Sequence, residues 1–192
     1  MKNNQEKMHN LLVEYQQLNQ KLLLKVQRDL DIPTDEIQRQ VVEPPASMDG
    51  LEISSFDPRN PQRLTAMLQA RFSYAGSWKM AEAGIEWLSL NQIKSASLSV
   101  QNVEMVHEAT TLWEGSSLFR VPLSRISLFG IHPKQGEMIY LIWPVIVGEE
   151  PEIISYSCNI ENRYLNLEHY LKSLIGDAKK GLQSRKGAGV DS

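Results

Sequence analysis

The side chains that could do chemistry in this chain are four histidines and a single cysteine. His9, His107, His132 and His169 are scattered, and none has the spacing of a zinc-ligand pair with another histidine or with Cys158. Cys158 has no paired cysteine and no nearby lysine, which favours a buried or edge thiol over a nucleophile. A triad built from one distant histidine stays open, because triads are recognised by geometry rather than by sequence position.

Sequence motifs for catalysis and for cofactor binding are absent as well. The chain has no Gly-x-Gly-x-x-Gly after an apolar run, no Gly-Lys-Ser/Thr phosphate loop and no Gly-x-Ser-x-Gly elbow. We therefore predict no catalytic residue, no cofactor and no metal, and we expect a protein that is not an enzyme. An enzyme with a scattered site is the remaining alternative.

Four carboxylates lie on either side of the most continuously apolar stretch of the chain. Glu137 precedes the run 138–143, and Glu149, Glu150 and Glu152 follow it. These residues are either a solvated hairpin tip or an acidic surface that attracts a basic partner and raises its association rate. We expect no metal there, because no defined loop such as an EF-hand surrounds the cluster.

Tryptophan is the second candidate for partner binding. Most of the four tryptophans, at positions 78, 87, 113 and 143, should lie in the core. Trp78 stands in a weakly patterned segment, and we predict that it is an exposed anchor for a partner. The predicted partner-binding residues are therefore Glu137, Glu149, Glu150, Glu152 and Trp78.

Composition limits the class of protein. The 192 residues are 42% hydrophobic and 22% charged, which is typical of one folded domain with additional ends. The net charge of −3 gives no electrostatic reason to expect nucleic acid as a partner. A single cysteine excludes an internal disulfide and favours a reducing, cytoplasmic location. No apolar run approaches the roughly 20 residues of a membrane span, so we expect a soluble protein that does not enter a membrane.

An amphipathic helix is predicted at the start of the chain, within region 1–31. Residues 4–30 contain no glycine or proline, and apolar residues recur at steps of three and four. The helix should end before Pro33, because a residue that precedes proline is disfavoured in the helical conformation. Its apolar stripe has two interpretations: packing against the same domain, or a homodimer formed through residues 4–30.

The middle of the chain is predicted to contain a connector, two helices and several strands. The proline-rich segment 32–60 reads as a connector, and a helix with Asn60 as N-cap and Pro61 at its first position should end near Gly76. A capping box formed by residues 89 and 92 predicts a short helix. Segment 100–113 is predicted to form one or two strands, and 118–121 and 126–131 further strands.

The last third of the chain is predicted to form a hairpin covered by a helix. Segment 138–143 should be a central strand that ends at Pro144 and pairs with 152–156. Asn166 should cap a helix over 167–175 that Gly176 closes, and 177–192 should be a mobile tail. The fold class is α+β, a mostly antiparallel sheet flanked by helices with an added N-terminal helix, and the main domain spans 61–176.

The order of these elements resembles the SUKH superfamily, which joins bacterial toxin-immunity proteins and fungal cell-wall assembly regulators. The resemblance covers residues 86–176. Its motifs are Trp87-Leu-Ser-Leu-Asn-Gln-Ile, Phe129-Gly130 with Gly136-Glu-Met-Ile-Tyr-Leu-Ile-Trp, Pro151-Glu-Ile-Ile-Ser-Tyr, and Arg163-Tyr-Leu-Asn-Leu-Glu-His-Tyr-Leu-Lys-Ser-Leu-Ile.

This resemblance implies a non-catalytic domain that binds and neutralises a cognate toxin, often a nuclease. The acidic residues would then face the basic nucleic-acid groove of the toxin. The alternative from the fungal members is an intracellular scaffold or regulator that assembles through its N-terminal helix.

Overall fold

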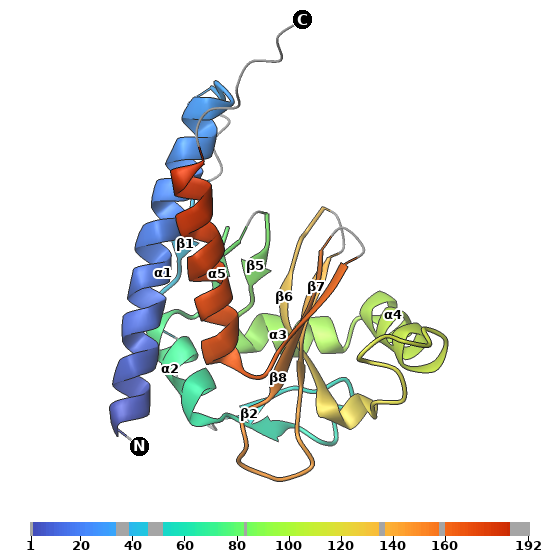
Figure 1. The fold of residues 1–192 in the computed structure, drawn as a ribbon. Helices are drawn as coiled ribbons and strands as arrows, with labels where there is room; N and C mark the ends of the chain where they lie inside the picture. The colour runs from blue at the N-terminus through green and yellow to red at the C-terminus, as the bar shows by residue number, and fades with distance from the viewer. Residues whose placement is uncertain are drawn as a thin grey trace, which may run out of the picture.

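The computed structural model describes residues 2–33, 39–45, 52–82, 84–134, 137–157 and 160–184 (Figure 1). Within them lie five α-helices, one short 3₁₀ helix and nine strands. The helices are α1 (Lys2–Asp29), α2 (Ala66–Tyr74), α3 (Leu90–Ser97), α4 (Val100–Thr111), the 3₁₀ turn η1 (Leu123–Arg125) and α5 (Leu167–Gln183). The strands are β1 (Val41–Val42), β2 (Glu52–Ile53), β3 (Gln62–Arg63), β4 (Trp78–Lys79), β5 (Glu86–Trp87), β6 (Ile126–Ile131), β7 (Met138–Ile142), β8 (Glu152–Ser157) and β9 (Ile160–Tyr164).

A seven-stranded sheet in the order β1-β4-β5-β6-β7-β8-β9 forms the centre, and β2 pairs separately with β3. Every neighbouring pair of strands is antiparallel, so the predicted α+β class with a mostly antiparallel sheet is confirmed. All five residues of β7 are buried, because both faces of this strand are covered. The predicted hairpin is also present, with Ile142 of β7 opposite Glu152 of β8.

Helices α1 and α5 lie side by side on one face of the sheet, and α2 packs beside them (Figure 1). The ring of Trp87 in β5 lies 5.9 Å from the rings of both Tyr15 in α1 and Tyr170 in α5. Lys7 pairs with Glu168 between the two helices at 2.8 Å. The first interpretation of the N-terminal helix, packing against its own domain, is therefore confirmed, because Met8, Leu12 and Tyr15 of α1 belong to the common core.

Helices α3 and α4 lie on the other side of the sheet (Figure 1). The predicted capping box is confirmed, because the Ser89 hydroxyl accepts from the Gln92 amide and the Gln92 side chain accepts from the Ser89 amide. The strands predicted over 100–113 are wrong: α4 buries Val106, Ala109 and Thr110. These positions have the three-to-four spacing of a helix, and the imperfect alternation was a poor match to a strand.

Two other elements differ from the sequence prediction in this half of the chain. Segment 118–121 forms no strand but a turn, in which Arg120 has a φ of 62°. Strand β9 was not predicted, although it pairs with β8 along its full length.

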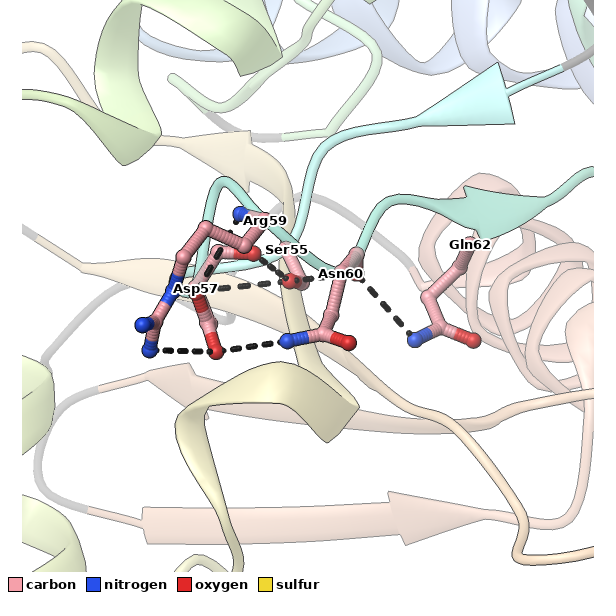
Figure 2. Close-up of polar contacts among 5 residues, drawn as sticks. All are labelled: Ser55, Asp57, Arg59, Asn60 and Gln62. Carbon is pink, nitrogen blue, oxygen red and sulfur yellow. Dashed lines mark hydrogen bonds and ion pairs between the residues drawn. The ribbon is translucent and has the colours of Figure 1, made fainter.

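The helix predicted to start at Asn60 starts instead at Ala66. Figure 2 shows the reason: the Asn60 side chain donates to the carboxylate of Asp57 at 2.7 Å. The same carboxylate accepts from the Arg59 backbone amide at 3.2 Å and from its Nε at 3.1 Å. The Ser55 hydroxyl lies 2.8 and 2.9 Å from the carbonyls of Asp57 and Asn60. This network closes the loop between β2 and β3 and leaves Asn60 unable to cap a helix.

Helix α5 begins as predicted, since the Asn166 side chain accepts from the His169 amide at 3.1 Å. It does not stop at Gly176 but continues to Gln183, so the predicted mobile tail is wrong for residues 177–183. Ala178 is buried, and a side chain at Gly181 would meet the Leu22 side chain of α1 at 2.8 Å. The long partner helix thus covers the segment, whose own composition predicted no structure. Residues 185–192 lie outside the described part.

Arg71 is fully buried and connects α2 to the sheet. Its guanidinium donates to the carbonyls of Ala75 at 2.6 Å, Gly76 at 3.0 Å and Leu88 at 3.2 Å. The group also lies 4.4 Å from the ring centre of Phe72. Burial lowers the pKa of Arg71 to about 9, which still leaves it protonated at neutral pH. Arg71 therefore acts as a charged donor to three carbonyls at the end of α2 and the end of β5.

Candidate functional site

The four predicted carboxylates do not form one surface. Glu149, Glu150 and Glu152 lie at one end of the sheet, in and beside the loop between β7 and β8. Glu137 lies at the other end, where its carbonyl accepts from the His132 amide at 2.8 Å. The five residues of β7 separate the two ends by about 17 Å. The four carboxylates therefore cannot act as one predicted surface, because Glu137 lies apart from the other three.

Two of the other three carboxylates make contacts within the fold. Glu150 accepts from the Thr65 hydroxyl and, at 3.1 Å, from the Met67 amide in the first turn of α2. Glu152 accepts from Arg163 of β9 at 2.6 Å. Glu149 is exposed. Only Glu149 therefore keeps the role of a surface carboxylate that a partner can approach without breaking a contact described here.

Trp78 is fully buried, so its predicted role as an exposed anchor is wrong. Its ring lies 5.7 Å from Tyr15, 5.9 Å from Tyr74 and 5.2 Å from Trp87. The pairing of β4 with β5 places Trp78 directly opposite Trp87, on the face that α1 and α2 cover. A strand of two residues is too short for its alternation to show this in the sequence.

The residues that sequence reasoning missed are apolar side chains in the loop between β7 and β8, residues 143–151. Val145, Ile146 and Val147 are 80%, 64% and 92% exposed. The sequence signal was available, because three aliphatic residues follow Pro144 directly in a segment predicted as a hairpin connection. We call these three residues together with Glu149 the loop patch.

The fold holds both ends of this loop. At its start, the Trp143 amide donates to the Arg125 carbonyl at 2.8 Å, and the Trp143 indole donates to the Ser127 hydroxyl at 2.8 Å. At its end, Glu150 binds the first turn of α2. The loop patch is therefore presented from a fixed frame at one end of the molecule (Figure 1).

A buried polar network lies at the opposite end, around the turn between β4 and β5. The Glu82 carboxylate accepts from the Tyr170 hydroxyl and, at 3.1 Å, from the Trp87 indole. The Tyr15 hydroxyl and the Asn19 amide donate to the Ala81 carbonyl. Burial raises the pKa of Glu82 above its ordinary value, and the charge of the nearby Glu137 raises it further.

This network fastens the turn to α1 and α5. Burial raises the pKa of both tyrosine hydroxyls as well, so they remain neutral donors. The network contains no nucleophile activated by a base, and its chemistry is that of a structural contact.

Three adjoining cavities share lining residues, and two of them lie beside α3. A cavity of 670 Å³ shares Lys79 with one of 400 Å³, and it shares Asn91 and Gln92 with one of 490 Å³. His132 lines the 400 Å³ cavity, whose described lining includes no serine, threonine or cysteine. Here too the described residues bring no nucleophile together with a histidine.

No group of three His, Cys, Asp or Glu side chains that could hold a metal ion occurs among the described residues. Cys158 lies outside them. No described helix has both the length and the apolar character needed to cross a membrane.

The fold and the loop patch together define an α+β domain with a seven-stranded antiparallel sheet and an exposed aliphatic loop at one end. Comparison with protein-family models, with curated proteins and with solved structures finds no match to this chain.

Proposed function

We propose that the chain is a non-catalytic protein-binding domain of the immunity type, which neutralises a cognate toxin by binding it in the cytoplasm. One observation carries the proposal: the loop patch exposes three consecutive aliphatic side chains on a loop held at both ends. Such a group is costly to leave in water and gains stability when a partner covers it. The SUKH resemblance supplies the toxin as the kind of partner.

The chemistry of the loop patch describes the partner. The centre of the partner's binding surface would be an apolar hollow that receives Ile146 and its two valine neighbours. Glu149 beside them favours a basic rim, as in a protein whose own ligand is nucleic acid. Because the loop is fixed before binding, little conformational entropy is lost on association, and the three side chains can act as a compact hot spot.

The test is growth rescue with direct affinity measurement. The products of the genes that adjoin this one are expressed singly to find a growth inhibitor, which is then co-expressed with the wild-type chain. Replacement of Val145, Ile146 and Val147 by serine should abolish rescue and weaken binding about 100-fold or more in calorimetry. Unchanged rescue and affinity, or no growth inhibitor among the adjoining products, would overturn the proposal.

A matched control separates binding from general loss of apolar surface. Val100 at the start of α4 and Leu112 directly after its end are 71% and 69% exposed, and their replacement by serine should leave affinity within about twofold. Glu149→Lys should slow association several-fold, and this effect should shrink as salt rises. Circular dichroism of each variant verifies that the fold is unchanged.

A scaffold that assembles through α1 is the second candidate, and one observation favours it. The apolar stripe of α1 continues beyond the core to Val26 and Leu30, which are 41% and 68% exposed. Deletion of residues 1–30 would remove Met8, Leu12 and Tyr15 from the core, so point variants are the appropriate test. Light scattering should show an assembly that the Val26→Ser, Leu30→Ser variant dissociates; a monomeric wild type would exclude this candidate.

A further inference from the structure

The 400 Å³ cavity lies at the end of the sheet opposite the loop patch. Its described lining comes from several segments: the approach to β1, strand β4 and the turn after it, strand β5, and the turn after β6. The lining residues are Arg39, Lys79, Met80, Gly84, Glu86, His132, Pro133 and Lys134. A volume of this size falls within the range of small-molecule sites.

Positive charge gathers around this cavity, with no ion-pair partner among the described residues. Arg39, Lys79 and Lys134 are exposed, and none lies within ion-pair distance of a described carboxylate. The cavity's one carboxylate, Glu86, accepts from the Gln92 side chain at 2.8 Å. Three cations from three different segments therefore converge on one hollow, in a chain whose net charge is −3.

The wall of the cavity is apolar and contains a flat ring. A side chain at Gly84 would place its Cβ 2.1 Å from Nε2 of His132, so the imidazole lies directly against the glycine backbone. Gly84 also has a φ of 82°, which other residues rarely adopt. The Lys134 amide donates to Nδ1 of His132 at 3.3 Å, and this contact fixes the ring and places the lysine beside it. Met80 and Pro133 complete the apolar part.

We propose that this cavity binds a small phosphate-bearing molecule with a flat ring, such as a nucleoside monophosphate. The three cations hold the phosphate group, because exposed lysine and arginine side chains are good phosphate ligands. The imidazole of His132 and the Met80 and Pro133 side chains contact the ring, which gains from leaving water. The site is separate from the loop patch, so its failure would leave the protein-binding proposal intact.

Calorimetry with three probes tests both parts of the site. Adenosine monophosphate, inorganic phosphate and adenosine are titrated into the full-length protein at low ionic strength. The monophosphate should bind at least about tenfold more tightly than either of the other two probes. Its binding should weaken as salt is added. No measurable binding of the monophosphate at millimolar concentration would overturn the proposal. Equal affinity for the monophosphate and inorganic phosphate would overturn the role of the ring wall.

Matched variants assign the binding to this cavity. Replacement of Arg39, Lys79 and Lys134 by glutamine should weaken monophosphate binding at least tenfold. The control replaces Lys21, Arg63 and Lys94, which are exposed cations outside this cavity, and removes the same charge; its affinity should stay within about twofold. Equal losses in both triple variants would show non-specific attraction and would overturn the site.

Gly84→Ala tests the ring wall independently of charge. The added methyl group must displace the His132 imidazole, so monophosphate affinity should fall several-fold while inorganic phosphate affinity stays the same. Because the left-handed backbone at this position is strained by any side chain, thermal unfolding is measured alongside. His132→Ala removes the ring without that strain and should give the same selective loss; unchanged monophosphate affinity in this variant would contradict the role of the ring.

Discussion

Glu150 supplies the helix cap that α2 lacks in its own sequence. Thr65 occupies the N-cap position, but its side chain makes no capping hydrogen bond. Instead the Thr65 hydroxyl donates to Glu150, and the Met67 amide donates to the same carboxylate at 3.1 Å. A residue more than eighty positions away along the chain thus satisfies an amide that a helix start leaves unpaired. Glu150→Ala removes this contact without touching the apolar core.

The expected loss can be summed from the separate contacts. Loss of an N-cap acceptor costs about 1 kcal/mol, and loss of a negative charge at a helix N-terminus costs about 0.3–1 kcal/mol. The Thr65 hydroxyl, which is largely buried, loses its acceptor in this variant. That loss adds up to about 1 kcal/mol to the destabilisation. Because Thr65 can rotate to cap the helix itself, we expect a net loss of about 2 kcal/mol. In a chain of this length that lowers the unfolding temperature by about 4–8 °C.

Urea unfolding followed by circular dichroism measures this loss, and Glu149→Ala is the matched control. The neighbouring carboxylate is exposed, and its removal changes the net charge equally, so its free energy of unfolding should change by less than about 0.5 kcal/mol. Glu150→Gln keeps an acceptor oxygen and should lose about half as much as Glu150→Ala. In a double-mutant cycle with Thr65→Ala, the coupling should reach about 1 kcal/mol. Equal stability of the two alanine variants would refute the capping role.

Two further predictions concern the buried polar groups. Glu82→Gln keeps an oxygen facing Tyr170 and Trp87. Burial raises the pKa of the wild-type Glu82 in the folded state. The wild-type carboxyl therefore favours folding at low pH, and this contribution to stability is lost as pH rises through the folded-state pKa. The variant should therefore unfold at a higher temperature than the wild type at about pH 8 and lose this advantage towards about pH 4, and an advantage independent of pH would contradict the assignment. Arg71→Lys cannot reach the carbonyls of Ala75, Gly76 and Leu88 together, so urea unfolding should show a loss of about 2–4 kcal/mol, against less than about 0.5 kcal/mol for exposed Arg63→Lys.

The parts of the fold that sequence predicted are those whose signal is local and strong. Strand β7 is apolar along its whole length, and such a run is typical of a strand buried on both faces. The caps at Ser89 and Asn166 bind amides within their own first turn, so the pattern and the contact coincide in the sequence. The N-terminal helix has apolar residues at regular steps of three and four from Met8 to Leu22.

The parts that sequence missed depend on contacts between distant segments. Asn60 has the residue type of an N-cap, but Asp57 competes for its side chain and the helix begins later. Strands β4 and β5 have two residues each, so the pairing of β4 with β5, and of β5 with β6, rather than propensity decides that Trp78 faces inward. Helix α5 passes through Gly176 because α1 offers it a surface. Propensity is a weak guide wherever tertiary packing outweighs it.

In the candidate site, too, the sequence predicted the type of residue but not the contacts that each residue makes in the fold. Glu149, Glu150 and Glu152 carry the same charge and lie close together in the sequence. Glu149 is exposed, Glu150 caps a helix and Glu152 pairs with Arg163. Because the two bound carboxylates fix the end of the loop, they bear on partner binding through the position of Val145 to Val147 rather than through their charge. Glu150→Ala should therefore weaken partner binding by freeing the loop, whereas Glu149→Ala should act on the association rate and leave loop order unchanged.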